Sequence, residues 1–95
     1  MMNVYADEEK VKKIADHYGI KNQLRQLAEE CSELSVESSH SARHGTTVKI
    51  IEEIADVMIM IEQVIYLAKI DKYDIEECID YKINRQLKRI EEEEE

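Results

Sequence analysis

The sequence predicts an all-α fold, a four-helix bundle formed by one domain that spans residues 1–95. Three observations support this prediction: the chain has no proline and only two glycines, 37% of its residues are charged, and its apolar residues recur every three or four positions. Such spacing is typical of amphipathic helices that bury one face. A domain of 95 residues buries a modest share of its surface, so a lone monomer would be only marginally stable.

Glycine and capping residues set the expected helix boundaries. Gly19 is expected to end the first helix as a left-handed C-cap. Thr46 or Thr47 can cap the third helix, and Asp71 or Asp74 the fourth, because their side-chain oxygens accept hydrogen bonds from free backbone N–H groups. With these limits the helices are predicted at about 7–18, 21–43, 47–69 and 74–90.

The chain is strongly acidic, and its charge excludes some classes of partner. The acidic run at residues 91–95 is expected to form a disordered tail, because negative charge is unfavourable at a helix C-terminus. A formal net charge of −9 argues against binding a nucleic-acid polymer, which requires a basic surface. A small anion that brings its own Mg²⁺ is compatible with this charge.

Cysteine content and hydropathy predict a cytoplasmic protein that does not enter a membrane. The two cysteines do not make a disulfide framework, and no secretory signal segment precedes the domain. The longest apolar run, residues 57–65, is interrupted by Glu62 and Gln63 and is too short to span a membrane.

A helical wheel separates an apolar stripe from an acidic flank on the second and third helices. The predicted stripes comprise Leu24, Leu27, Cys31 and Leu34 on the second helix, and Ile50, Ile54, Val57, Ile61, Val64 and Ala68 on the third. Cys31 is therefore expected to be buried. Glu30 and Glu33 line the flank of the second helix, whereas Glu29 points outward. Glu53 intrudes on the edge of the third stripe, where an acid is costly to desolvate unless it has a partner.

Two pairs of carboxylates on these flanks predict a metal site. Residues three apart lie on one helix face, so Glu30 pairs with Glu33, and Glu53 with Asp56. A short turn between the helices would make them antiparallel and could bring all four acids together. Four carboxylates repel one another unless a cation lies among them, and oxygen ligands favour a hard ion such as Mg²⁺ or Mn²⁺.

The other face of the third helix and the basic end of the fourth suggest further roles. Ala55, Ile59 and Tyr66 make the third helix apolar nearly all round, which predicts a homodimer or homotetramer. On the fourth helix, Lys82 and Arg89 flank an isoleucine stripe. Their position suits binding of a polyphosphate, although cations in the last turns of a helix also suit its dipole.

The two acidic segments carry a family resemblance. The stretches Gln26-Leu27-Ala28-Glu29-Glu30-Cys31-Ser32-Glu33-Leu34 and Ile51-Glu52-Glu53-Ile54-Ala55-Asp56-Val57 resemble those of the MazG-like nucleotide pyrophosphohydrolases, in the all-α superfamily that includes dimeric dUTPases. Lys82-Ile83-Asn84-Arg85 with Arg89 is similar to the basic segment of that family. The resemblance covers residues 18–89.

The resemblance implies both a ligand set and a reaction. It implies Mg²⁺ binding and phosphate binding by the following residues: Glu30, Glu33, Glu53 and Asp56 for the metal, and Lys82, Arg85, Arg89 and Asn84 for the phosphates. Glu29, Glu30 and Glu33 would be catalytic, with Glu29 in a supporting position. The implied reaction converts a nucleoside or deoxynucleoside triphosphate and water into the monophosphate and pyrophosphate, as in house-cleaning of the nucleotide pool.

Two alternatives remain open from the sequence. The first is a catalytically silent helical module that mediates assembly or regulation. The second is an enzyme similar to phosphoribosyl-ATP pyrophosphatase. Release of pyrophosphate from nucleotides in the presence of a metal separates the enzymes from the silent module.

Overall fold

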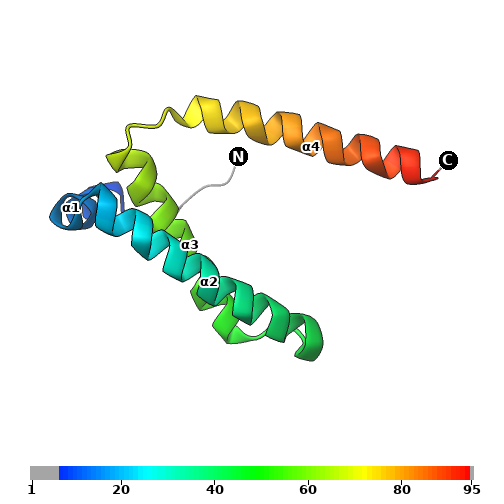
Figure 1. Ribbon diagram of the computed structural model, residues 1–95, viewed down its shortest axis with the longest axis horizontal. Helices are drawn as coiled ribbons and strands as arrows, with labels where there is room; N and C mark the ends of the chain where they lie inside the picture. Colours follow the sequence, from blue (N-terminus) through cyan, green and yellow to red (C-terminus); the bar gives the residue numbers. More distant parts are fainter. Residues whose placement is uncertain (1–6, 95) are drawn as a thin grey trace.

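The computed structural model describes residues 7–94, and these residues form four helices and no strand (Figure 1). The helices are α1 (Glu8–Tyr18), α2 (Ile20–His44), α3 (Val48–Leu67) and α4 (Lys72–Glu94). The predicted all-α class and the number of helices are therefore confirmed. Within the described residues, no helix is long and apolar enough to cross a membrane.

Short side chains and glycines produce the helix boundaries. The Asp7 carboxylate caps α1 by accepting hydrogen bonds from the backbone N–H groups of Glu9 and Lys10. Asp71 caps α4 in the same way, through the backbone N–H of Tyr73 at 2.9 Å. Gly19 has φ 83° and ψ 164°, so its positive φ was predicted but its ψ is extended and not left-handed helical. A side chain is strained at this φ, which explains glycine at the junction of α1 and α2.

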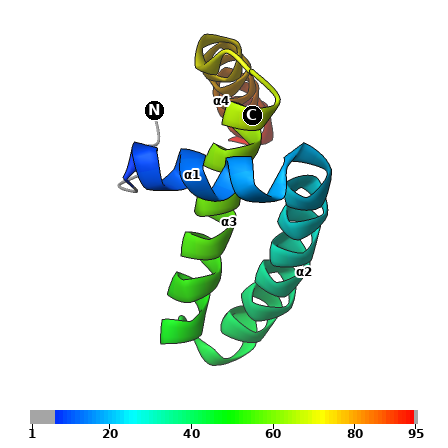
Figure 2. The same ribbon diagram turned by 90° about the vertical axis from the view of Figure 1, so that its left-hand side faces the viewer.

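The antiparallel pair of α2 and α3 forms the centre of the molecule. The two helices lie side by side, joined by residues 45–47, and α1 crosses the near side of α3 in Figure 2. The Tyr66 hydroxyl of α3 donates hydrogen bonds to both carboxylate oxygens of Asp16 in α1, at 2.9 and 3.0 Å. Residues of α1 thus cover part of the α3 face that was predicted to be an interface between subunits.

The fourth helix extends away from the other three. It diverges from α2 and α3 in Figure 1 and lies behind α3, on the side opposite α1, in Figure 2. None of its residues is buried. An ion pair of 3.1 Å between Lys72 Nζ and Glu62 Oε2 joins its first turn to α3. We therefore describe α4 as an arm that the other three helices leave uncovered.

The arm also extends further than the sequence predicted. A non-helical tail was expected from residue 91, but α4 continues through Glu94, and residue 95 lies outside the described residues. Glutamate is a good helix former, and its unfavourable interaction with the helix dipole costs only a fraction of a kcal/mol to about 1 kcal/mol at an exposed site. Helix propensity therefore outweighs the dipole here.

The core between α2 and α3 is partly polar, which differs from the predicted stripes. The buried residues are Val11, Ala15, Gln23, Glu37, Glu53, Val57, Met60 and Gln63. Leu24 is 48% exposed, Ile54 is 43% exposed and Cys31 is exposed, so the prediction of a buried Cys31 was wrong. Both helices are rotated so that their polar flanks face each other, with Gln23 Nε2 donating to Gln63 Oε1 at 2.7 Å.

Candidate metal centre between α2 and α3

Three of the four predicted metal ligands converge between α2 and α3. Glu30 and Glu33 project from α2 and Glu53 from α3, and each offers a carboxylate oxygen within 4.8 Å of the other two. We call these three residues the acidic cluster. Asp56 lies one turn after Glu53 but is exposed and does not belong to the group. The structure thus brings together three of the four predicted acids, and their binding of a metal stays a prediction.

The cluster contains buried oxygens with unused hydrogen-bonding capacity. Glu53 is only 9% exposed, and its Oε2 is buried without a hydrogen-bond partner. Glu30 Oε2 is in the same situation, whereas Glu30 Oε1 accepts a hydrogen bond from Gln26 Nε2 at 2.9 Å. Burying a carboxylate oxygen without a hydrogen-bond donor costs free energy. A bound cation, or a donor from another molecule, would remove that cost.

The donor set fits a small hard cation. In octahedral coordination at about 2.1 Å, two oxygen ligands lie about 3 to 4.2 Å apart, so oxygens within 4.8 Å of one another need only small side-chain movements to bind one ion. All three side chains are carboxylates, which suit Mg²⁺ or Mn²⁺. Among the described residues, no lysine, arginine or histidine forms an ion pair with any of the three.

A hollow lies next to the acidic cluster on α2. It is lined by Tyr18, Asn22, Gln23, Arg25 and Gln26. Gln26 joins the two features, because it lines the hollow and donates to Glu30. Asn22 is held by a 2.8 Å hydrogen bond from its Nδ2 to the Tyr18 carbonyl oxygen. The hollow is therefore lined by polar side chains, one aromatic ring and one cation, and Gln26 links it to the cluster.

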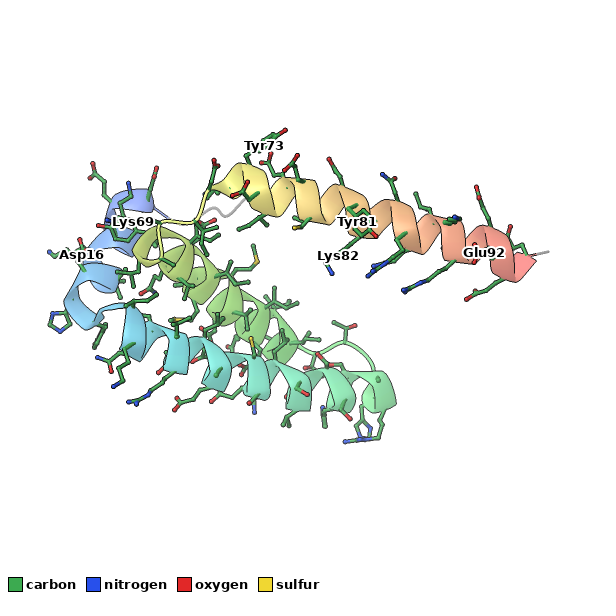
Figure 3. All side chains as sticks on the ribbon, turned by 45° about the horizontal axis from the view of Figure 1, so that its top comes forward. Asp16, Lys69, Tyr73, Tyr81, Lys82 and Glu92 are labelled. Atoms are coloured by element: carbon green, nitrogen blue, oxygen red, sulfur yellow. The ribbon has the colours of Figure 1, made fainter. Side chains whose placement is uncertain are left out.

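The remaining predicted site residues do not surround the cluster. Glu29 is exposed on the outside of α2, as predicted. The predicted phosphate-binding residues are all exposed on the arm: Lys82, Asn84, Arg85 and Arg89. Figure 3 shows Lys82 on α4, apart from α2. A single chain therefore does not bring its basic segment onto its acidic cluster.

The structure also shows buried polar residues that the sequence interpretation did not assign a role. Glu37 is 7% exposed and accepts a hydrogen bond of 3.1 Å from Thr47 Oγ1, and His40 Nδ1 lies 3.5 Å from the same carboxylate oxygen. The available signal was the position of Glu37 on the same flank of α2 as Glu30. Its partner could not be found in this way, because Thr47 comes from the turn before α3.

Comparison with known proteins finds no match to this chain. No protein-family model matches the chain, and no curated protein or solved structure matches it.

Proposed function

We propose that this chain is a Mg²⁺-dependent nucleoside triphosphate pyrophosphohydrolase, which converts a nucleoside or deoxynucleoside triphosphate and water into the monophosphate and pyrophosphate. The observation that supports the proposal most is the acidic cluster, in which Glu30 and Glu53 each bury a carboxylate oxygen that has no partner. The two acidic segments that supply the cluster are also the ones that resemble the MazG-like enzymes.

The carboxylates would hold the ion and the attacking water. Glu30, Glu33 and Glu53 would provide the ligands, and Asp56, three residues after Glu53 on α3, would be the fourth. Bound Mg²⁺ would neutralise phosphate charge and lower the pKa of a bound water. A carboxylate of the cluster, or the neighbouring Glu29, would accept the proton of that water.

The reaction also needs cations beside the pyrophosphate, because negative charge develops on this leaving group. Lys82, Arg85 and Arg89 would stabilise the negative charge that develops on the departing pyrophosphate, and Asn84 would donate a hydrogen bond. These residues lie on an arm that stands apart from the cluster in one chain, so the proposal requires them to reach a cluster in some other way.

Product analysis tests the proposal directly. The purified protein is incubated with a panel of canonical, damaged and phosphoribosylated nucleotides, with and without Mg²⁺, in ¹⁸O-labelled water. We expect pyrophosphate as product and label in the monophosphate only, because water attacks the α phosphorus. Label in pyrophosphate or orthophosphate, or no turnover of any nucleotide, would contradict the proposal and favour a silent helical module.

A matched pair of variants links the activity to the cluster. Glu53→Gln keeps the size of the side chain but removes the charge, and we expect a loss of roughly 100-fold or more in turnover. Glu52→Gln makes the same change at the exposed neighbouring position and should change turnover little. Equal turnover in both variants would exclude Glu53 from the site.

A further inference from the structure

The acidic flank of α2 continues past the acidic cluster into a pair of histidines. A helical wheel places five residues, three or four positions apart, on one side of the helix: Glu30, Glu33, Glu37, His40 and His44. The first three are carboxylates and the last two are imidazoles. Two of the three histidines of the chain are in this row. It therefore offers nitrogen ligands that begin about 10 Å along the helix from Glu33.

The two imidazole rings have the separation expected for two ligands of one metal ion. The ring centroids of His40 and His44 are 4.7 Å apart, and the ring planes are inclined at 47°. With metal–nitrogen distances of about 2.1 Å, two imidazoles on one ion have centroids about 4.6 Å apart at a right angle and about 5.3 Å apart at a tetrahedral angle. Both rings are exposed, so an ion bound by them would keep its other coordination positions open to water.

A buried carboxylate lies beside the first ring and orients it. Glu37 is 7% exposed, and its Oε1 lies 3.5 Å from His40 Nδ1. The same oxygen accepts a hydrogen bond of 3.1 Å from Thr47 Oγ1, which holds the carboxylate against the start of α3. Because Nδ1 faces this carboxylate, Nε2 is the nitrogen of His40 that remains for a metal. Histidine ligands of metal ions almost always have such a partner on their second ring nitrogen.

The neighbouring cation is directed away from the two rings. Arg43 lies between the histidines in the sequence, and its charge would repel a metal ion bound beside them. Its Nη1 instead donates a hydrogen bond of 3.1 Å to Ser39 Oγ, and the wheel places Ser39 well away from His40 and His44. Protonated histidines at a helix C-terminus also suit the helix dipole, but that interaction requires neither paired rings nor a buried carboxylate beside them.

We propose that His40 and His44 form a second metal site, separate from the acidic cluster, which binds a transition ion such as Zn²⁺ or Ni²⁺ through two imidazole nitrogens, with Glu37 as a positioning residue. Imidazole suits these ions, whereas Mg²⁺ is bound by oxygen ligands. The ion links residues four apart and so closes the last turn of α2 before Gly45. The site goes beyond the proposed function, because it uses no residue of the acidic cluster and no nucleotide.

Titration with Ni²⁺ tests the site, and the third histidine provides a matched control. The two exposed cysteines are replaced by serine in all samples, and Glu53→Gln is added, so that neither thiolates nor the acidic cluster compete for the ion. We expect calorimetry to show one Ni²⁺ per chain. His40→Ala and His44→Ala should each weaken binding more than tenfold, since each removes a ligand, whereas His17→Ala, at an exposed position of α1, should leave it unchanged. Absence of Ni²⁺ binding, or equal effects of the three changes, would overturn the site.

Electron paramagnetic resonance with Cu²⁺ identifies the ligand atoms. Cu²⁺ binds more tightly than Ni²⁺ or Zn²⁺ to a site of a given kind, so it reports on the same residues. In the same samples we expect splitting from two imidazole nitrogens, and from one nitrogen after His44→Ala. An excess of Mg²⁺ should leave the spectrum unchanged. A spectrum without nitrogen splitting, or one that His44→Ala does not alter, would contradict binding by the pair.

A conservative change tests the role of Glu37. Glu37→Gln keeps the length of the side chain and an oxygen that can accept from Thr47, but it removes the negative charge beside His40. We expect roughly tenfold weaker binding of Ni²⁺, with both nitrogens retained in the Cu²⁺ spectrum, because the partner of a ligand tunes affinity without being a ligand itself. Glu52→Gln removes one charge at an exposed position of α3 and should leave the affinity nearly unchanged. Equal losses in both variants would mean that only net charge matters, and Glu37 would then have no positioning role.

Discussion

Buried polar residues determine how α2 and α3 face each other. Four polar side chains are buried in the described structure, and each comes from one of these two helices: Gln23, Glu37, Glu53 and Gln63. Gln23 and Gln63 satisfy each other, and Glu37 receives a donor from Thr47. Glu53 differs from them because one of its oxygens has no donor. Glu30 of α2 also has a buried oxygen without a donor, and we assign a ligand to these two carboxylates together.

Tyr66 provides a pH-dependent contact between α3 and α1. Its hydrogen bond to Asp16 raises its pKa above the ordinary value of 10.0, and desolvation and the negative charge of Asp16 act in the same direction. Folding therefore favours the protonated phenol. The stability from this contact is fully present below about pH 10, and is lost as the pH rises through the raised pKa of the folded protein.

We expect Tyr66→Phe to reveal this contact in the alkaline range. Its stability deficit relative to wild type should be constant below about pH 10 and should shrink above it, as wild type loses the contact. Urea unfolding between neutral and strongly alkaline pH measures the deficit. Tyr81→Phe, which removes an exposed tyrosine of the arm, serves as the control. A deficit that does not change with pH would mean that Asp16 does not hold the phenol.

At the scale of elements, the connection between α2 and α3 fixes their separation. Gly45 has a positive φ of 87°, and its N–H closes α2 on the Ser41 carbonyl oxygen at 2.7 Å. Thr47 precedes α3 without forming a side-chain cap, because its hydroxyl donates a hydrogen bond to Glu37 in α2 instead. The turn therefore gives up a local hydrogen bond for one that joins the two helices.

Thr47→Val should destabilise the protein without changing the shape of the turn. Valine has nearly the same volume and tolerates the extended backbone of this position, but it leaves the 7% exposed Glu37 without its hydroxyl donor. We expect a loss of about 1–3 kcal/mol in the free energy of unfolding, measured in urea. Thr47→Ser retains the hydroxyl and should lose clearly less. Equal losses would show that the methyl group, and not the hydroxyl, matters.

The sequence was sufficient to predict the helices but not their rotation or the position of the arm. Glycines and capping residues such as Gly19 and Asp71 act locally, so their effect can be inferred from neighbouring residues. A helical wheel finds the apolar direction of an isolated helix, but contacts such as Gln23 to Gln63 decide which edge meets the neighbour. This explains why Cys31 is exposed. The placement of α4 depends on surfaces beyond its own segment, which periodicity does not encode.

At the scale of the whole molecule, negative charge is in excess, and some of it is concentrated between α2 and α3. The formal net charge is −9, and three of the acids lie within 4.8 Å of one another in the acidic cluster. Added salt screens charges that lie more than about 10 Å apart at 0.1 M, so it relieves general repulsion. Carboxylate oxygens within 4.8 Å of one another are too close and too buried for such screening to remove their repulsion.

This difference predicts distinct effects of sodium and magnesium chloride on thermal stability. At matched ionic strength both salts should raise the melting temperature by screening, and MgCl₂ should raise it further, because an ion that binds only the folded state stabilises it by mass action. Glu53→Gln should melt at a higher temperature than wild type in metal-free buffer, as repulsion is relieved, and should lose the additional effect of MgCl₂. Glu52→Gln, at the exposed neighbouring position, should keep it. Equal shifts with both salts in wild type would mean that Mg²⁺ acts through ionic strength alone, and the cluster would then have no cation to explain its buried oxygens.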